Sequence, residues 1–128
     1  MYIIRGKVIR GEGYGKQLGF PTANLDRRHF SRLKVKPKLG IWAGRARILT
    51  THYSLPTINY KAAIVIGPKD KNGLPKIEAH LIGFKGNLYG KKLTLDVVKY
   101  LRPFKKYRNE RELIVQIRKD VASVKKYA

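Results

Sequence analysis

Five segments of the chain have the composition of β-strands, because β-branched and aromatic residues recur in them between glycines and prolines. Apolar and polar residues alternate in most of these segments, which is typical of a strand with one buried face. The segment Tyr60–Ile66 is almost continuously apolar instead, which predicts burial on both faces. The predicted strands are Tyr2–Arg10, Ile41–Leu49, Tyr60–Ile66, Lys76–Phe84 and Leu93–Leu101.

The C-terminal end of the chain changes to the spacing of a helix. Its apolar residues recur at intervals of three or four, at Leu113, Ile117, Val121 and Val124. Asn109 is followed three residues later by Glu112, which resembles the capping box that starts many helices. The sequence therefore predicts a helix over Asn109–Tyr127, after a strand that ends before Pro103.

Five or six strands followed by one helix predict an all-β fold, a small antiparallel barrel or sandwich that the helix caps. A parallel α/β sheet is not expected, because no helices separate the predicted strands. Gly86-Asn87 lies between the last two strands and predicts a hairpin there. The longer loops are Arg27–Lys38 and Thr50–Asn59, and the length predicts one domain over residues 1–128.

Charge says more about the partners than about the fold. The chain has 29 lysines and arginines against 8 aspartates and glutamates, a net charge of +21. This favours anions such as nucleic acids, nucleotides, phosphorylated metabolites or an acidic membrane surface. The absence of cysteine excludes a disulfide scaffold, a cysteine-ligated metal and a thiol nucleophile. Neither a membrane-spanning apolar run nor a signal peptide is visible, so a cytoplasmic protein is expected.

The densest chemical signal directly follows the first predicted strand, where glycines cluster at Gly11, Gly13, Gly15 and Gly19. Glycines let successive backbone N–H groups turn toward an anion, and Lys16 adds positive charge beside them. The spacing fits neither the P-loop nor the dinucleotide-binding fingerprint, and no helical pattern follows it. The glycines alone favour an ordinary glycine-rich hairpin.

Pro21-Thr22-Ala23-Asn24 follows the glycines and supplies two side-chain oxygens. In an extended segment the Thr22 hydroxyl and the Asn24 amide point to the same side, because they are two residues apart. Hard cations such as Mg²⁺ take oxygen ligands of this kind together with phosphate oxygens. Taken alone, the segment is more typical of a turn in which Thr22 and Asn24 bind nearby backbone groups.

The Gly-x-Gly pattern followed by Lys16–Asn24 resembles the signature of the riboflavin kinase (flavokinase) family. Further segments that resemble the family follow in the same order and extend the resemblance over nearly the whole chain. They are Gly40-Ile41-Trp42-Ala43, Ile77-Glu78-Ala79-His80-Leu81, Leu88-Tyr89-Gly90, Tyr100-Leu101-Arg102-Pro103 and Gln116-Ile117-x-x-Asp120. The loop Gly67–Gly73 departs from the family pattern, so no ligand contact is carried over to it.

The resemblance implies a six-stranded antiparallel Greek-key barrel that transfers the γ-phosphoryl group of ATP to the 5′-hydroxyl of riboflavin, giving FMN. It implies Glu78 as the catalytic carboxylate and Mg²⁺ or another divalent cation at Thr22 and Asn24. The nucleotide-binding residues that it implies are Gly11, Lys16, Thr22, Asn24, Leu81 and Tyr89. The flavin-binding residues that it implies are Arg102, Lys105 and Tyr107, where Tyr107 replaces a more usual phenylalanine.

The residues themselves also single out Glu78. It shares one face of its predicted strand with His80, opposite a face made of Ile77, Ala79 and Leu81. If this apolar face packs outside the barrel under the helix, Glu78 points into the interior, where a carboxylate needs a function or a partner. The alternative is a surface glutamate paired with a lysine. His80 is expected to be a hydrogen-bonded structural residue.

A second interpretation is a small basic barrel that binds RNA or single-stranded DNA through a basic groove and exposed aromatic residues. It does not explain why Pro21–Asn24 and Glu78 occur together. A third is a flavin-binding module without turnover, supported only by the altered Gly67–Gly73 loop. The kinase is the preferred interpretation, with riboflavin and ATP as its partners. A monomer without membrane contact is expected, and any nucleic acid is expected to bind only non-specifically through charge.

Overall fold

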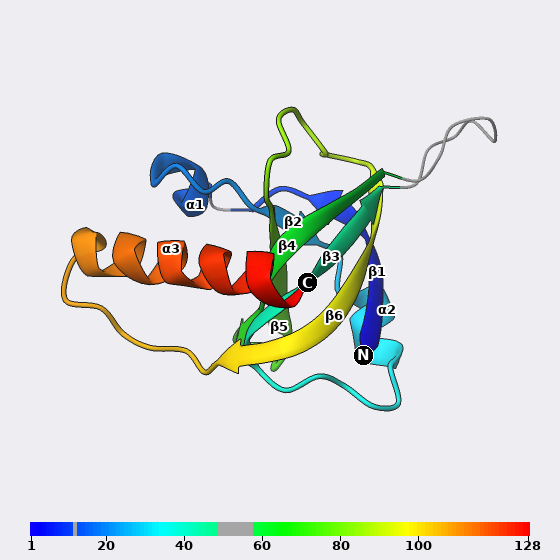
Figure 1. Cartoon of the computed structure of the whole chain (residues 1–128). Helices are drawn as coiled ribbons and strands as arrows, with labels where there is room; N and C mark the ends of the chain where they lie inside the picture. The colour runs from blue at the N-terminus through cyan, green and yellow to red at the C-terminus, as the bar shows by residue number, and fades with distance from the viewer. Residues whose placement is uncertain (12, 49–57) are drawn as a thin grey trace.

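The structure is a computed structural model that describes residues 1–11, 13–48 and 58–128. Within these residues it shows six antiparallel strands closed into a barrel, with one long helix on the outside (Figure 1). This confirms the predicted fold class. The strands are β1 (Tyr2–Ile9), β2 (Ala23–Leu25), β3 (Gly40–Ile48), β4 (Ile58–Lys69), β5 (Pro75–Leu81) and β6 (Lys92–Arg102). The helices are α1 (Tyr14–Gln17), α2 (Arg28–Arg32) and α3 (Glu110–Tyr127).

The five strands predicted from the sequence are confirmed, with ends that differ by a few residues. Leu49 and most of the predicted loop Thr50–Asn59 lie outside the described residues. Three short elements were not predicted: β2, α1 in the glycine-rich segment and α2 in the predicted loop Arg27–Lys38. Each has three to five residues, which is too short to display the period of a strand or helix.

Around the barrel the strands lie in the order β1-β2-β5-β4-β3-β6, and β6 pairs with β1 to close it. The predicted hairpin at Gly86-Asn87 is wrong, because β5 and β6, which this connection joins, are not neighbours. β5 pairs with β2 and β4, whereas β6 pairs with β1 and β3. The Asn87 side chain makes a local turn instead, in which its Oδ1 accepts a hydrogen bond from the Tyr89 backbone N–H at 2.8 Å.

Apolar side chains from all six strands fill the barrel interior, and Ile77, Ala79 and Leu81 of β5 are among them. The expectation that these three residues pack outside the barrel is therefore wrong. Because side chains alternate along a strand, Glu78 points to the outer surface and not into the interior. Any site that contains Glu78 must accordingly lie on the outside of the barrel.

The middle of β4 is buried on both faces, as its continuous apolar run predicts. Ala62, Ile64 and Ile66 belong to the interior core, whereas Ala63 packs under α3. Ile82, which follows β5, packs against the same outer cluster. The outer face of β4 is thus covered by α3 at Ala63 and is not exposed to solvent there.

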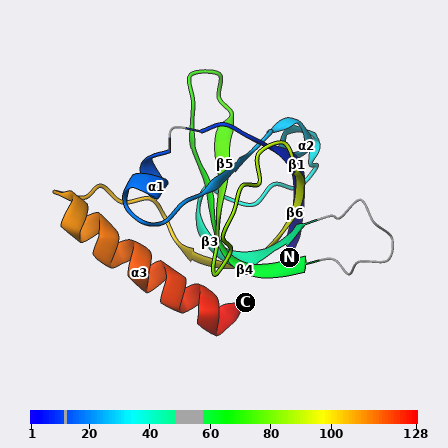
Figure 2. The same ribbon diagram turned by 90° about the horizontal axis from the view of Figure 1, so that it is seen from above.

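α3 lies across the outside of the barrel against β3 and β4 (Figures 1 and 2). Asn109 caps its N-terminus, because the Asn109 Oδ1 accepts a hydrogen bond from the Glu112 backbone N–H at 3.0 Å, which confirms the predicted start. Ala43 and Ala63 on the barrel surface pack against Val124, which is fully buried. Within the described residues, no helix has both the length and the apolar character that crossing a membrane requires.

Candidate active site

A groove between α3 and the outer face of the barrel forms a cavity of about 380 Å³, which we call the helix pocket. Its walls come from α3, from the glycine-rich segment and from the segment that follows β6. Most of its lining is apolar, with Leu18, Phe20, Ile41, Ala63, Val65, Phe104, Leu113 and Ile117. A largely apolar cavity of this size with a few polar groups suits a flat organic ligand.

The floor of the helix pocket is one row of outward-facing residues that crosses five paired strands. Asn24 of β2 pairs with Glu78 of β5, which pairs with Val65 of β4. Val65 pairs with Ile41 of β3, and Ile41 pairs with Arg102 of β6. Directly opposite residues point to the same side, with Cβ atoms ~4.5–5.5 Å apart. The register of the barrel therefore places the carboxylate of Glu78 beside the amide of Asn24.

His80 lies two residues from Glu78 on the same face and holds the segment that leads into β2. Its Nδ1 lies 2.8 Å from the backbone oxygen of Pro21, and it must donate there, because a carbonyl oxygen only accepts. Its ring packs edge-on against Phe20, with the centroids 5.7 Å apart. This agrees with the structural role expected for His80, which fixes the residues directly before Thr22.

A bidentate ion pair joins the end of β6 to α3 at the pocket. Arg102 donates from Nε to Asp120 Oδ1 at 2.8 Å and from Nη2 to Asp120 Oδ2 at 2.7 Å. Gln116 donates to the same carboxylate at 3.0 Å, and Asp120 is buried. The hydrogen bond to Asp120 raises the pKa of Arg102, which therefore keeps its charge. Arg102 lines the pocket as predicted, but two of its donors are bound to α3.

Lys105 and Tyr107 line the same pocket, on the segment between β6 and α3. Lys105 is exposed, whereas Tyr107 is half-buried. The hydroxyl of Tyr107 is buried and has no hydrogen-bond partner in the described part of the chain. Tyr107 lies near Arg102 and raises the pKa of Arg102, with a smaller effect than Asp120. A buried hydroxyl without a partner loses free energy relative to water, so a ligand that accepts from it would be favoured.

A second cavity of about 600 Å³ lies between the glycine-rich segment and the connection 84–89, and we call it the loop pocket. The predicted nucleotide-binding residues Gly11, Lys16, Leu81 and Tyr89 all line it. Tyr89 is 56% exposed at its edge, whereas Leu81 is mainly a residue of the barrel core. Three residues, Gly13, Thr22 and Asn24, line both pockets. The two cavities therefore meet at the segment 22–24.

Gly11 is needed because the Asn24 side chain lies directly against it. A Cβ atom at position 11 would come within 2.0 Å of Asn24 Nδ2 and 2.4 Å of Asn24 Cγ, closer than any real contact. Gly13 and Gly19 differ from Gly11: both have positive φ angles and open space around them, so they serve the backbone path. Gly11 thus sets the position of the Asn24 amide between the two pockets.

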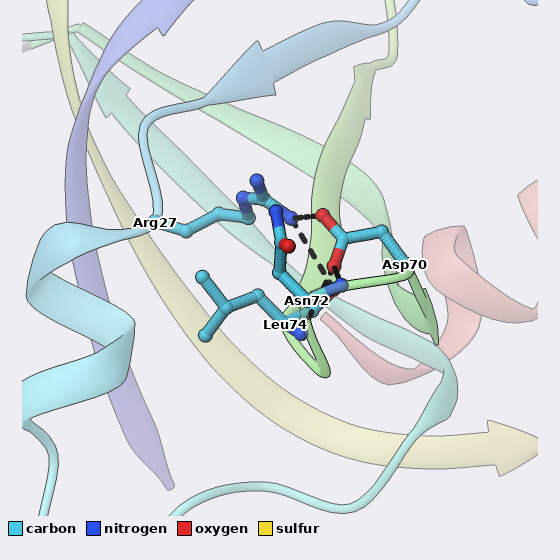
Figure 3. A network of polar contacts seen from close by, with 4 residues as sticks. All are labelled: Arg27, Asp70, Asn72 and Leu74. Atoms are coloured by element: carbon cyan, nitrogen blue, oxygen red, sulfur yellow. Dashed lines mark hydrogen bonds and ion pairs between the residues drawn. The ribbon is translucent and has the colours of Figure 1, made fainter.

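An ion pair at the far end of β2 ties this short strand to the β4–β5 turn (Figure 3). Arg27 donates to Asp70 at 2.5 Å and to the Leu74 backbone oxygen at 3.2 Å. Asp70 also accepts from the backbone N–H groups of Asn72 and Leu74. The hydrogen bond from Arg27 is the main reason why the pKa of Asp70 is lowered. No residue that lines the helix pocket or the loop pocket comes from the altered Gly67–Gly73 loop.

A metal ion would depend on few protein ligands here. Among the described residues, no group of three or more histidine, aspartate or glutamate side chains could hold one. The oxygens of Thr22 and Asn24, with Glu78 paired to Asn24, fit a cation that takes its other ligands from phosphates and water. Mg²⁺ is commonly bound in this way.

The structure thus brings all the predicted site residues to two adjoining pockets. Sequence reasoning named Asp120 only within a segment that resembles the family and gave it no role, and it did not predict the contact of His80 with Pro21. The segment Gln116-Ile117-x-x-Asp120 contains the only sequence signal for the first of these, since residues four apart share one helix face. The contact between His80 and Pro21 joins residues 59 positions apart and leaves no local pattern.

Three comparisons with known proteins bear on this site. The family model for riboflavin kinase (Flavokinase) matches residues 1–128. The human riboflavin kinase is 36% identical over 129 residues, which cover 98% of this chain and 79% of the human protein.

Two solved structures share the fold. A structure described as a macrolide-efflux protein from Streptococcus pneumoniae has a TM-score of 0.80 at 22% identity, covering 98% of this chain but 39% of its own. The riboflavin kinase from Trypanosoma brucei has a TM-score of 0.68 at 24% identity, covering 97% of this chain and 77% of its own. At these identities the two structures support the fold alone.

Proposed function

The chain belongs to the riboflavin kinase family, and on this premise we propose how its two pockets share the reaction. The activity is the ATP-dependent phosphorylation of riboflavin: the γ-phosphoryl group of ATP passes to the 5′-hydroxyl, giving FMN and ADP. Phosphoryl transfer depends mainly on positioning both substrates and neutralising the charge of the transferred group. The hydroxyl and the γ-phosphate must therefore meet at the place where the two pockets join.

The helix pocket is the proposed riboflavin site. Its apolar walls suit the flat isoalloxazine ring, which would lie between the segment 102–107 and the start of α3. Tyr107 can donate its unpartnered hydroxyl to a carbonyl or nitrogen of the ring, and Lys105 can do so from the rim. Arg102 acts mainly by holding α3 in place through Asp120. The ribityl chain then runs along the floor toward Glu78.

The loop pocket is the proposed ATP site. Its lining is rich in glycine, so backbone N–H groups can approach the phosphates closely, and Lys16 adds positive charge. Tyr89 offers an aromatic face at the edge for the base, with Leu81 beneath. Thr22 and Asn24 would hold Mg²⁺ or another divalent cation, which when bound neutralises charge on the phosphates.

Glu78 is the proposed general base. Its carboxylate takes the proton from the 5′-hydroxyl while the oxygen of that hydroxyl forms a bond to the γ-phosphorus. The bond from the γ-phosphorus to the oxygen of ADP breaks in the same step, so charge and atoms balance. Asn24, opposite Glu78 and fixed by Gly11, orients the groups at this junction.

The observation that carries the proposal is that Thr22 and Asn24 line both pockets, with Glu78 next to Asn24. The test is to incubate the chain with riboflavin, ATP and Mg²⁺ and to measure FMN and ADP by mass spectrometry. Equal amounts of both products are expected, and none when any one component is omitted. Riboflavin binding without FMN would instead support a flavin-binding module.

We further propose that residues 1–128 act as one unit and as a monomer, because both pockets are complete within one chain. ATP as a substrate favours the cytoplasm as the place of action. The alternative function, a barrel whose main role is to bind RNA or single-stranded DNA, explains neither the junction of two pockets nor the position of Glu78. Sedimentation of the chain at several concentrations would test the monomer.

A further inference from the structure

The side of the barrel away from α3 carries positive charge that neither pocket uses. Of the 29 lysines and arginines, all within the described residues, five line the two pockets: Arg10, Lys16, Lys85, Arg102 and Lys105. β1, α2 and the adjoining part of β6 lie on the opposite side of the barrel from α3 (Figures 1 and 2). Outward-facing cations of β1, β3, β6 and α2 form what we call the basic face: Arg5, Lys7, Arg28, Arg32, Arg45, Arg47 and Lys92.

The strand register sets like charges directly opposite each other on this face. Four basic residues form these pairs: Lys7 of β1 pairs with Lys92 of β6, and Arg45 of β3 pairs with Lys61 of β4. Arg45 also lies opposite Asp96 of β6 on its other side, and Lys61 donates to the Lys125 backbone oxygen at 3.0 Å, so the second pair is partly offset. All four side chains are exposed, because their neighbours along each strand fill the interior. Like charges in directly opposite positions destabilise a sheet. The Lys7–Lys92 pair therefore carries a cost in the free protein that a bound polyanion would remove.

Acidic residues do little to offset this charge. Asp96 is the one acid on the outward positions of β1, β6 and the described part of β3, and both of its oxygens bind Arg47, at 2.8 and 3.1 Å. Asp26 lies 3.5 Å from Arg28, whose side chain is 84% exposed. Lys7, Arg45 and Lys92 have no hydrogen bond or ion pair through their side chains within the described residues.

Between α2 and β1 this surface is hollowed into a groove of about 750 Å³. Its cationic and histidine lining consists of Arg5, Lys7, Arg28, His29, Arg32 and Lys92. The backbone N–H of Arg5 donates to His29 Nδ1 at 2.9 Å, so the Nε2 of this ring carries the proton in the neutral form. The groove thus presents several donors along its length, and Asp26 is the only acid among the described residues that line it.

We propose that the basic face and its groove bind the phosphodiester backbone of a single-stranded nucleic acid, in addition to the kinase reaction. The cations are spaced over three adjacent strands and one helix, as an extended polyanion requires and a single phosphate group does not. A membrane fits less well, because a flat bilayer surface cannot enter the groove and peripheral proteins usually bury an apolar helix face in it. Contacts to phosphates predict little preference for sequence or sugar.

The test uses a labelled 12-nucleotide RNA of mixed sequence and its DNA counterpart, with dissociation constants from fluorescence anisotropy at two salt concentrations. The face variant is Lys7→Gln/Arg45→Gln/Lys92→Gln. The matched control, Arg111→Gln/Arg118→Gln/Lys119→Gln, removes three exposed positive charges from α3. The face variant should bind the RNA and the DNA at least about tenfold more weakly at low salt. The slope of log K against log salt, which is negative, should become smaller in magnitude by roughly 2. The control should change affinity less than about threefold.

FMN formation should stay unchanged in both variants. The face variant should melt no lower than the wild type, because it relieves the like-charge pair Lys7–Lys92, and Arg45 has no ion pair to lose within the described residues. Equal losses in both variants would overturn the proposal, since the charge would then act diffusely. No binding of either strand, or binding only to vesicles of phosphatidylcholine with one part in three phosphatidylserine, would also overturn it.

Discussion

The helix pocket and the loop pocket share Thr22 and Asn24, but their other walls are of different kinds. Side chains of a long helix and of five paired strands build the helix pocket, and the buried pair Arg102–Asp120 clamps its two sides together. Glycines and connecting segments build most of the loop pocket, where Tyr89 is largely exposed. The first pocket is therefore held by packing, whereas the second depends on the path of the backbone.

This difference predicts that the affinities of the two substrates respond to different residues. Substitutions around α3 should change riboflavin binding and stability together, because one set of contacts serves both. Substitutions in the glycine-rich segment should change nucleotide binding with less effect on stability, because little apolar area is buried there. Only the residues at the junction should affect both substrates or turnover itself.

The largest effect is expected from Glu78→Gln, which lies at the junction. Removal of the general base should lower kcat by ~10²–10⁴-fold, because Asp120 is the only other acid among the described residues that line the helix pocket, and it is bound to Arg102. Both substrates should bind nearly as before, as calorimetric titration with riboflavin and MgADP will measure. Glu110→Gln on exposed α3 is the control. A kcat near the wild-type value would remove Glu78 from the mechanism.

Asp120→Ala should show most clearly that the two pockets respond to different residues. It leaves the Arg102 guanidinium without its buried partner, which should lower the free energy of unfolding by roughly 3 kcal/mol. The Kd of riboflavin should rise while that of MgADP stays unchanged. Asp96→Ala, which breaks the pair with Arg47 on the other side of the barrel, is the matched control and should leave both constants unchanged. If Asp120→Ala loses stability but binds riboflavin normally, the clamp does not shape the pocket.

Thr22→Val and Asn24→Ala should each lower the affinity for MgADP by about tenfold, because each deletes one oxygen that can bind the cation or orient a phosphate. The affinity for riboflavin should fall by a smaller factor. Gly11→Ala should weaken MgADP binding as Asn24→Ala does, although it keeps the Asn24 amide, because the added Cβ would displace that amide. Equal losses for both ligands in all three variants would mean that the segment had collapsed.

The smallest effect is expected from Asp70→Asn, which weakens the tie between β2 and the β4–β5 turn. The pKa of Asp70 is lowered, so its ion pair stabilises the fold above the ordinary carboxyl value of 3.8 and ceases to do so as pH falls further. The melting temperature should be slightly lower than that of the wild type at neutral pH. This gap should close as the pH falls below about 4. A gap that is constant with pH would mean that the charge of Asp70 does not cause the effect.

The residue patterns predicted the main strands and the long helix, and the family resemblance implied the six-stranded barrel, but the interior face of β5 and the partners of β6 were not predicted. Alternation along β5 correctly separated Glu78 and His80 from the apolar residues between them. It could not tell which face was the interior, because the residues of the outer face line the helix pocket and are followed by the apolar Ile82. The crossing from β5 to β6 was read as a hairpin for a similar reason: pairing between distant strands has no signature in a connection such as Gly86-Asn87.

The candidate site was predicted residue by residue through a family resemblance, while its geometry came only from the structure. The sequence placed Thr22 and Asn24 on one side of an extended segment, but nothing in it indicated that Glu78 would lie beside Asn24, because β2 is too short to show a period and its pairing with β5 is long-range. Arg102 and Asp120 are 18 positions apart on different elements, so their ion pair could not be inferred either. No residue of the altered Gly67–Gly73 loop lines either pocket, although Gly67 lies against Phe104, which lines the helix pocket.

The row from Asn24 through Glu78 and Val65 to Arg102 makes the activity of this enzyme depend on the correct register of its strands. A slip of β5 by one residue would turn Glu78 into the interior and expose Ile77, since side chains alternate along a strand. Such a chain could keep its β-sheet content and its circular dichroism spectrum. Specific activity after refolding would therefore measure the fraction of molecules whose strands paired in the correct register, which spectroscopy of secondary structure cannot measure.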